Sequence, residues 1–227
     1  REYWFKVMRH WLDHQNADGG WQYRGRGEST ATMTAAGVAS LFVCFDNLFA
    51  EAFVRCDVPN SFTAIQRGLD WFDRNFENSV GPGRTHHFHY YLYGIERVGL
   101  ASGYKYFGKT DWYKLGAEYL LRRQRSDGRW NNHIDTAFAI LFLVRGRLPV
   151  LFNKLQFDGD WNNRPLDLAN LTRWISRKFE KTVNWQIVNL RVPVEELHDA
   201  PILYISASKA PKLSDDEIDK LRRFILQ

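Results

Sequence analysis

The sequence predicts a chain of two parts: helical hairpins over residues 1–147, followed by an α/β sheet domain that begins at residue 151. Two observations carry this prediction. A glutamine, an Asp-Gly pair and a tryptophan recur in the same order after two separate helical patterns, and the hydrophobic period changes from helical to alternating after Pro149. An apolar content of 44% is sufficient for packed cores.

The first hairpin is predicted from an amphipathic helix and an apolar helix. Trp4, Val7, Met8, Trp11 and Leu12 follow a helical i, i+3, i+4 pattern, which indicates an outer helix with one wet face. We expect the Asp18-Gly19-Gly20 break to end this helix. Ser29 or Thr30 then caps a helix over residues 31–48, which is apolar in nearly every direction and is therefore an inner helix.

A second hairpin repeats this plan at a constant offset of 109 residues. Trp112, Leu115, Tyr119 and Leu120 form the outer stripe, and Asp135 or Thr136 is expected to cap the inner helix. A degenerate third pair lies between the two, with Trp71 matching Trp11 and with Gly81-Pro82-Gly83 in place of the tryptophan turn. Three such pairs predict a layered ring or solenoid without strands before residue 147.

The repeated turn is interpreted as a joint between hairpins. A glutamine side chain can satisfy backbone groups of a neighbouring helix, and the indole after the glycine turn can cover the junction. The alternative is an ordinary helix stop with a surface tryptophan. The structural residues of the predicted joints are Gln15, Asp18, Gly19 and Trp21, and Gln124, Asp127, Gly128 and Trp130.

The segments "QNADGGW" and "QRSDGRW" resemble the repeats of squalene and hopene cyclases and their α/α-toroid relatives, which include protein prenyltransferases. The resemblance implies an α/α toroid over residues 1–147. Cyclases in that family use a strong acid in a D-x-D-D-T-A segment, but here "NHIDTA" places Ile134 at the proton donor's position, and isoleucine has no proton to donate. Neither Cys44 nor Cys56 follows the aspartate that a prenyltransferase zinc site requires. No catalytic residue and no cofactor is therefore assigned.

Histidines at the start of the third pair's inner helix are the best metal candidates. His86 and His89 share a helix face, and together with Asp135 they would face the cavity of a toroid. Polar and aromatic packing is the favoured explanation of these histidines, as it is of His10 and His14, and no metal is assigned. The neighbouring aromatic residues could line a groove for an apolar or sugar ligand, or pack in the core: Phe88, Tyr90, Tyr91 and Tyr93.

The second part reads as strand, helix, strand, strand, helix. The segments "LFNKLQF", "WQIVNL" and "PILYISAS" are the strands, and Ser214 opens the last helix with a capping box that directs Ile218, Leu221 and Ile225 inward. This order predicts a parallel, three-layered sheet. Ligands of such sheets bind beyond the carboxyl ends of the strands. The candidate ligand-binding residues there are Asp160, Trp161, Asn162, Arg164, Ser206 and Ser208. The alternative is a structural loop in which Arg164 pairs with Asp160 and Trp161 packs on the helix.

Residues 151–227 resemble a bacterial domain family of unknown function, through "GDWNNRP", "PILYIS" and "LSDDEIDKLRR". The resemblance implies the first part of a flavodoxin-type or class I glutamine-amidotransferase fold. An amidotransferase needs a cysteine nucleophile, and residues 151–227 contain none. Ser206 or Ser208 could act only with His198, the single histidine of this part.

The net charge, the apolar runs and the chain ends bear on the possible partners and location of the protein. A net charge of +5 from scattered Lys and Arg favours a solvated surface, so we expect no nucleic-acid partner. The apolar run from Ala35 to Phe45 is shorter than the ~20 residues that cross a bilayer, so no transmembrane segment is predicted. The chain starts and stops inside helical patterns and is expected to be a fragment, so an exported or periplasmic location is not distinguished from others.

The favoured hypothesis is a non-catalytic binding protein, with a toroid arm and an amidotransferase-like domain that binds a protein or small-molecule partner. The alternative is a terpenoid-cyclase-like or polysaccharide-lyase-like enzyme that uses the cavity of the toroid.

Overall fold

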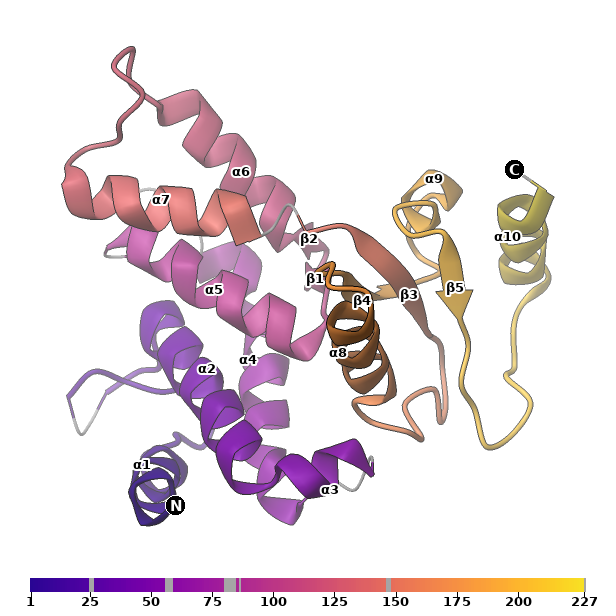
Figure 1. Cartoon of the computed structure of the whole chain (residues 1–227), viewed down its shortest axis with the longest axis horizontal. Coiled ribbons are helices and arrows are strands. Elements are labelled where there is room, and N and C mark those ends of the chain that lie inside the picture. The colour runs from indigo at the N-terminus through magenta and orange to yellow at the C-terminus, as the bar shows by residue number, and fades with distance from the viewer. Residues whose placement is uncertain (25–26, 56–58, 80–84, 86, 146–147, 227) are drawn as a thin grey trace. The chain divides into compact units, whose positions relative to one another are not determined.

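The computed structural model describes residues 1–24, 27–55, 59–79, 85, 87–145 and 148–226, and these divide into two compact units (Figure 1). The helical unit comprises Arg1–Phe53, Val58–Ser102 and Tyr106–Arg147. The α/β unit comprises Val54–Asp57, Gly103–Lys105 and Leu148–Gln227. The main boundary between the units lies at Leu148, and two short upstream segments belong to the second unit.

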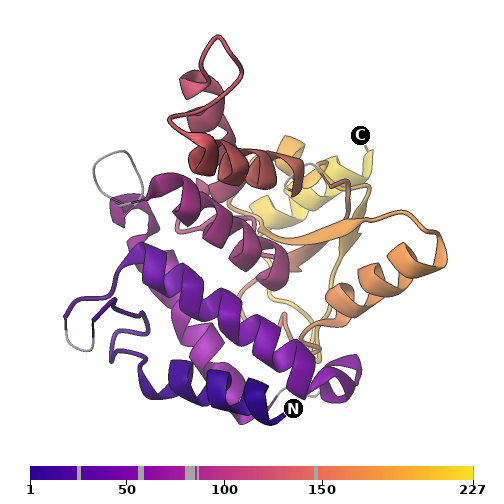
Figure 2. The same cartoon turned by 60° about the vertical axis from the view of Figure 1, so that its left-hand side comes forward.

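The helices of the first unit alternate between outer and inner as predicted, but two of the three outer helices pack chiefly on the inner helix of another predicted pair. The inner helices α2 (Ala31–Leu48), α5 (Phe88–Ser102) and α7 (His133–Arg145) contact one another in that order. The outer helices α1 (Glu2–Asp13) and α4 (Thr63–Ser79) pack against α2, and α6 (Trp112–Arg123) packs against α5 (Figure 2). Two short elements, α3 (Ala50–Val54) and η1 (Asn60–Phe62), connect α2 to α4. Within the described ranges these helices do not close into a ring.

Burial separates the two kinds of helix as the hydrophobic patterns predict. In α1 only Met8 is buried, whereas α2 buries ten residues, including Val38, Leu41 and Phe45. One face of α2 is not covered, and Val43 on it is 48% exposed although it was predicted to belong to an apolar inner helix. Thr30 caps α2 by accepting a hydrogen bond from the Met33 amide at 3.3 Å. Helix α2 is long and apolar enough to cross a membrane, whereas the sequence predicted no transmembrane segment. However, 56% of this helix is buried inside the protein, as in a core helix.

Several predicted boundaries in this unit are wrong. Helix α1 ends at Asp13, well before the Asp18-Gly19 turn, and α7 begins at His133, so its cap is Asn132 rather than Asp135 or Thr136. The Asn132 side chain accepts hydrogen bonds from the amides of Ile134 and Asp135, both at 2.9 Å. Asparagine is as good a cap as aspartate, so the earlier position prevailed.

Strands also occur before residue 147, contrary to the prediction. Tyr106–Phe107 (β1) and Thr110–Asp111 (β2) form a small antiparallel hairpin. Gly108 occupies its turn with φ +62°, a left-handed conformation that glycine adopts without steric cost. The Gly-Lys pair between two β-prone dipeptides was the local signal for this turn, and the helical repeat obscured it.

The α/β unit is built on a parallel sheet, as predicted, and its strand order is β4-β3-β5. Its elements are β3 (Val150–Gln156), α8 (Asp167–Lys178), β4 (Asn184–Asn189), α9 (Val194–Leu197), β5 (Ile202–Tyr204) and α10 (Asp215–Leu226). Lys154 of β3 lies opposite both Ile187 and Tyr204. The segment Gly103–Lys105 extends the sheet at β4, through a parallel bridge from Tyr104 to Ile187 and a 2.6 Å hydrogen bond from the Ile187 amide to the Gly103 carbonyl.

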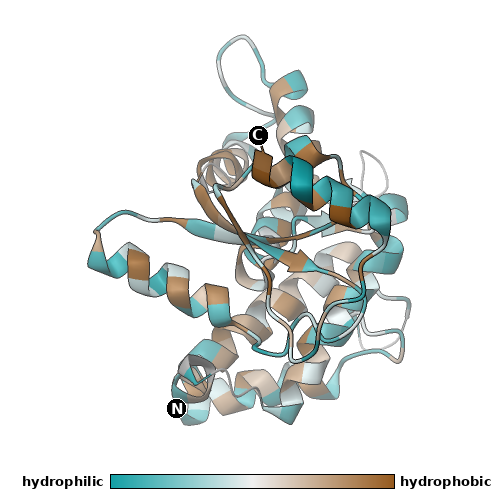
Figure 3. Ribbon diagram, turned by 90° about the vertical axis from the view of Figure 1, so that its right-hand side faces the viewer, coloured by the Kyte–Doolittle hydropathy of each residue, from teal (hydrophilic) through white to brown (hydrophobic). Residues whose placement is uncertain are grey.

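Helices cover both faces of this sheet. On one face Leu168 and Ile175 of α8 pack with Phe152, Trp185 and Ile187. On the other face Leu155 and Val188 pack with α9 and with Leu221 and Phe224 of α10. Figure 3 shows α10, beside the C label, with hydrophobic and hydrophilic residues around its circumference. Ile218 and Ile225 were predicted to point inward, but they are 36% and 77% exposed, because Leu221 and Phe224 lie on the face of α10 that meets the core.

Candidate functional site

The two Gln/Asp-Gly/Trp turns have the same hydrogen-bond pattern. Gln15 Nε2 donates to the Gly19 carbonyl at 2.8 Å, and Gln124 Nε2 donates to the Gly128 carbonyl at 2.9 Å. In both turns the aspartate, Asp18 or Asp127, accepts a hydrogen bond at 3.0 Å from the amide two residues later. Gly19 and Gly128 have φ +95° and +80°, so the glycine is required for the left-handed turn.

The tryptophans of these turns are also held alike. Trp21 Nε1 donates to the Trp11 carbonyl at 2.8 Å, and Trp130 Nε1 donates to the Leu120 carbonyl at 3.0 Å. Each backbone amide donates to a threonine hydroxyl of the following inner helix, and both indoles are buried. Trp21 also lies against Gly37 of α2 and Gly68 of α4, so its ring fills the space between these two helices.

Only the first turn connects two hairpins through its glutamine. Gln15 Nε2 also donates to the Ala64 carbonyl of α4 at 2.8 Å, while Gln124 makes only the local bond within the described part of the chain. Burial opposes ionisation of Asp18, but hydrogen bonds from Ser29, Gly20 and Trp71 outweigh it, with Arg74 adding to them, and lower the pKa of this carboxyl. These residues therefore act as a structural joint.

His89 and Asp135, predicted to share a cavity, do come together. His89 Nδ1 on α5 lies 3.5 Å from Asp135 Oδ1 on α7. The side-chain amides of Asn131 and Asn132 donate to the other oxygen of Asp135, at 3.0 and 3.1 Å. Burial lowers the pKa of His89 although the Asp135 charge acts to raise it, so the imidazole is neutral at pH 7. His89 Nε2 is sealed from solvent, which prevents it from reaching a dissolved substrate.

The remaining histidines show no metal geometry in the described ranges. His86 lies outside them. His14 Nδ1 is 2.7 Å from the His10 carbonyl, so this pair is engaged with its own helix. No group of three or more His, Cys, Asp or Glu residues is positioned to hold a metal ion among the residues that the structure describes.

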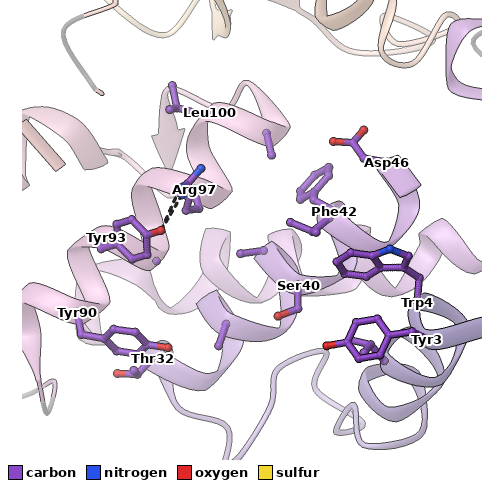
Figure 4. Close-up of a pocket in the computed structure, with 16 residues that line it drawn as sticks. Tyr3, Trp4, Thr32, Ser40, Phe42, Asp46, Tyr90, Tyr93, Arg97 and Leu100 are labelled. Atoms are coloured by element: carbon purple, nitrogen blue, oxygen red, sulfur yellow. Dashed lines mark hydrogen bonds between the residues drawn. The ribbon is translucent and has the colours of Figure 1, made fainter. Parts of the chain in front are cut away.

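The aromatic run on α5 divides between the two predicted uses. Phe88 and Tyr91 are buried in the core, whereas Tyr90 and Tyr93 line a groove of about 720 Å³ between α1, α2 and α5 (Figure 4). Tyr3 and Trp4 of α1 stand on the side opposite Tyr90 and Tyr93. The α1 residues were not singled out from the sequence, because their apolar pattern accounts for core packing alone.

The predicted ligand edge of the sheet is a closed polar network. Ser206 and Ser208 donate hydrogen bonds to Asn163 and Asp160, so the segment after β5 is tied to the loop after β3. Asp160 therefore accepts a hydrogen bond from Ser208. The ion pair between Asp160 and Arg164 that was considered for a structural loop is not found among the described residues. The exposed side chain of Arg164 extends from this loop.

Lys154 lies beneath this loop and is the main residue that sequence reasoning missed. Its side chain is 1% exposed, and Nζ donates to Asp167 Oδ1 at 2.7 Å, Asn162 Oδ1 at 2.8 Å and the Arg164 carbonyl at 3.2 Å. Trp161 lies 5.8 Å from the ammonium group, measured to the ring centroid. The sequence did contain a signal for this residue. Lys154 lies two residues after Phe152 and so shares its face of the strand, and such buried positions are normally apolar.

The serine-hydrolase arrangement is not formed. His198 stacks on Phe224 at 4.6 Å between ring centroids, while Ser206 and Ser208 donate hydrogen bonds to Asn163 and Asp160.

A second buried lysine, Lys105, forms ion pairs with Glu196 at 2.9 Å and Asp199 at 2.5 Å. Both lysines thus stabilise connections within the α/β unit.

Comparison with known proteins agrees with the boundary of this unit. Residues 150–227 match the model of a family described as a domain of unknown function (DUF4159). This finding confirms the resemblance of the second part and gives no support to the cyclase-like repeats of the first. Neither the curated proteins nor the solved structures contain a match to the chain.

Proposed function

We propose that this chain is a non-catalytic binding protein and that the groove between α1, α2 and α5 is its ligand-binding site. One observation carries the proposal: two aromatic walls stand on opposite sides of a floor made of small residues of α2, such as Ala36 and Ala39. The groove volume of about 720 Å³ lies within the range of small-molecule sites. Such sites combine apolar surface with a few polar groups, and Ser40 and Asp46 supply these here.

On this proposal the helical unit is an arc of an α/α toroid and the groove lies on its inner face. The matching geometry of the two tryptophan turns supports a repeated structure. The α/β unit would be an amidotransferase-like domain, which is consistent with its parallel strands and its two covering helical layers. Its closed network at the sheet edge fits a partner-binding surface better than a reactive centre, because the hydroxyls of Ser206 and Ser208 are already engaged.

The contact of His89 with Asp135 favours the enzymatic alternative, since such pairs position general bases. Two observations favour the binding role instead. His89 Nε2 is inaccessible, and Ile134 occupies the position of the cyclase acid with 56% of its surface exposed. Incubation of the purified chain with squalene is expected to give no cyclic product, and cyclisation that is lost in Asp135→Asn would establish the enzyme.

The binding site is tested by filling the groove. Ser40→Trp places a large ring on its floor, and Lys114→Trp adds the same ring to an exposed position of α6 as a matched control. Ligand-observed NMR with a mixed library of sugars, aromatic acids and amphiphiles is expected to identify compounds that bind the wild type and the control but not Ser40→Trp. If no compound distinguishes the two variants, the groove is not the binding site.

A further inference from the structure

We infer that the groove binds an extended, neutral oligosaccharide, an inference that rests on the groove being the binding site proposed above. Four aromatic side chains project along it, Tyr3 and Trp4 from α1 and Tyr90 and Tyr93 from α5 (Figure 4). Tyr3 is 67% and Tyr90 42% exposed, so both rings offer apolar surface to a ligand in the groove. Aromatic faces pack against the C–H faces of sugar rings, which is the chemistry that exposed rings on both sides of a slot offer.

The polar groups of the groove suit a ligand covered with hydroxyls. Three of the four rings, those of Tyr3, Tyr90 and Tyr93, carry a phenol hydroxyl, and the side chains of Thr32 and Ser40 add aliphatic hydroxyls beside the floor. Hydroxyl groups both donate and accept hydrogen bonds, as the hydroxyls of sugars do. A wholly apolar occupant, such as the hydrophobic face of a helix, would remove the hydroxyls of Tyr3 and Tyr90 from water without offering them a hydrogen bond, which costs free energy.

The charges of the groove are balanced, which favours a neutral ligand. Arg97 is the cation of the lining, and its Nε and Nη2 donate to the Tyr93 hydroxyl at 3.2 and 3.0 Å. Arg97 Nε also lies 3.7 Å from Glu96 Oε2, and Asp46 brings a negative charge to the same lining. The negative charge of Asp46 would repel an anionic sugar or a phosphate. The Arg97 guanidinium would not offset this repulsion, because it is already bonded to Tyr93.

The groove is long enough for a chain of rings. Its floor follows α2 from Thr32 to Asp46, which corresponds to about 21 Å at the rise of an α-helix. On α5, Tyr90, Tyr93 and Arg97 are spaced at i, i+3 and i+7, so they follow one face of that helix along the groove. A single small aromatic molecule would occupy only part of this length, whereas a chain of sugar rings would contact the aromatic side chains of both walls.

The inference is tested by titrating the whole chain with neutral hexasaccharides of β-1,4-linked glucose, xylose and N-acetylglucosamine and of α-1,4-linked glucose, with hexagalacturonate as the anionic comparison. Isothermal calorimetry is expected to detect at least one neutral sugar and no binding of hexagalacturonate. Tyr90→Ala and Tyr3→Ala should each weaken binding by about tenfold, since each removes one stacking ring. Tyr23→Ala removes an equally exposed tyrosine that does not line the groove, and should leave the affinity unchanged.

Circular dichroism of each variant verifies that it is folded. The inference is wrong if no neutral hexasaccharide binds, if only hexagalacturonate binds, or if folded Tyr90→Ala and Tyr3→Ala bind as the wild type does. A library compound that loses binding in Ser40→Trp while all sugars fail would leave the binding site in place and refute the sugar class alone.

Discussion

Lys154 Nζ lies 2.7 Å from Asp167 Oδ1 with both side chains largely withdrawn from solvent, so the central strand of the sheet is joined to the first residue of α8 by a buried ion pair. A buried charge is tolerated only when it is paired and hydrogen-bonded, and Asn162 and the Arg164 carbonyl complete the set around this ammonium. The pair therefore determines how the loop after β3 is held.

Lys154→Met should destabilise the α/β unit by about 3–5 kcal/mol, because it leaves Asp167 buried without its cation. Urea denaturation followed by tryptophan fluorescence measures the loss, with Lys178→Met at the exposed end of α8 as the control. Adding Asp167→Asn to Lys154→Met should recover part of the loss, since it removes the unpaired charge. Equal stability of Lys154→Met and the wild type would show that the pair is not a structural connection.

Trp21→Ala and Trp130→Ala should each cost about 3–5 kcal/mol of unfolding free energy, as expected for a buried aromatic ring. Trp174→Ala, which truncates a ring that is 59% exposed, should change stability by less than about 1 kcal/mol. Thermal and urea unfolding provide the comparison. A small effect at Trp130 with a large one at Trp21 would mean that the two turns are alike in hydrogen bonding but not in packing.

Gln15→Ala should destabilise the helical unit more than Gln124→Ala. The first substitution removes hydrogen bonds to the Gly19 and Ala64 carbonyls, and the second removes only the bond to the Gly128 carbonyl. At about 1 kcal/mol for each bond, the expected losses are about 2 and 1 kcal/mol. Parallel urea titrations measure both variants, and identical losses would remove the distinction between a joint and a local turn.

The pH dependence of stability should report on His89. Burial lowers the pKa of this imidazole in the folded state, so at mildly acidic pH the unfolded chain binds more protons than the folded chain. The contribution is fully present above the ordinary histidine pKa of about 6.5 and is lost as the pH falls through that value toward the lower folded pKa. Asp135 is the charged group that faces His89, and Tyr119 is the neighbouring ring.

Urea midpoints measured from pH 8 to pH 5 should therefore fall more steeply for the wild type than for His89→Gln, which cannot titrate. His133→Gln substitutes an exposed histidine and should follow the wild-type profile. A wild-type curve parallel to that of His89→Gln would show that the imidazole is not held in its neutral form.

Local hydrophobic periodicity and turn chemistry were sufficient to predict most elements from the sequence. The stripe on α1, the apolar character of α2 and the Asp-Gly turns depend on neighbours within a few residues, and these elements are found near their predicted positions. The capping box of Ser214 and Glu217 is also confirmed, with the Ser214 amide donating to Glu217 Oε2 at 2.8 Å. Where local signals competed, as between Asn132 and Asp135, the boundary was wrong by a few residues.

Contacts between distant segments were decided by the tertiary structure. The sequence determined the hairpins, the order of strands and helices, and the change at residue 150, because these follow from the spacing of apolar residues along the chain. It did not determine that Gly103–Lys105 joins the sheet, that Lys154 is neutralised by Asp167, or that Tyr3 and Tyr90 flank one groove. Those contacts join residues that are far apart in the sequence. Local patterns do not specify such partners, and the packing of the folded chain decides between them.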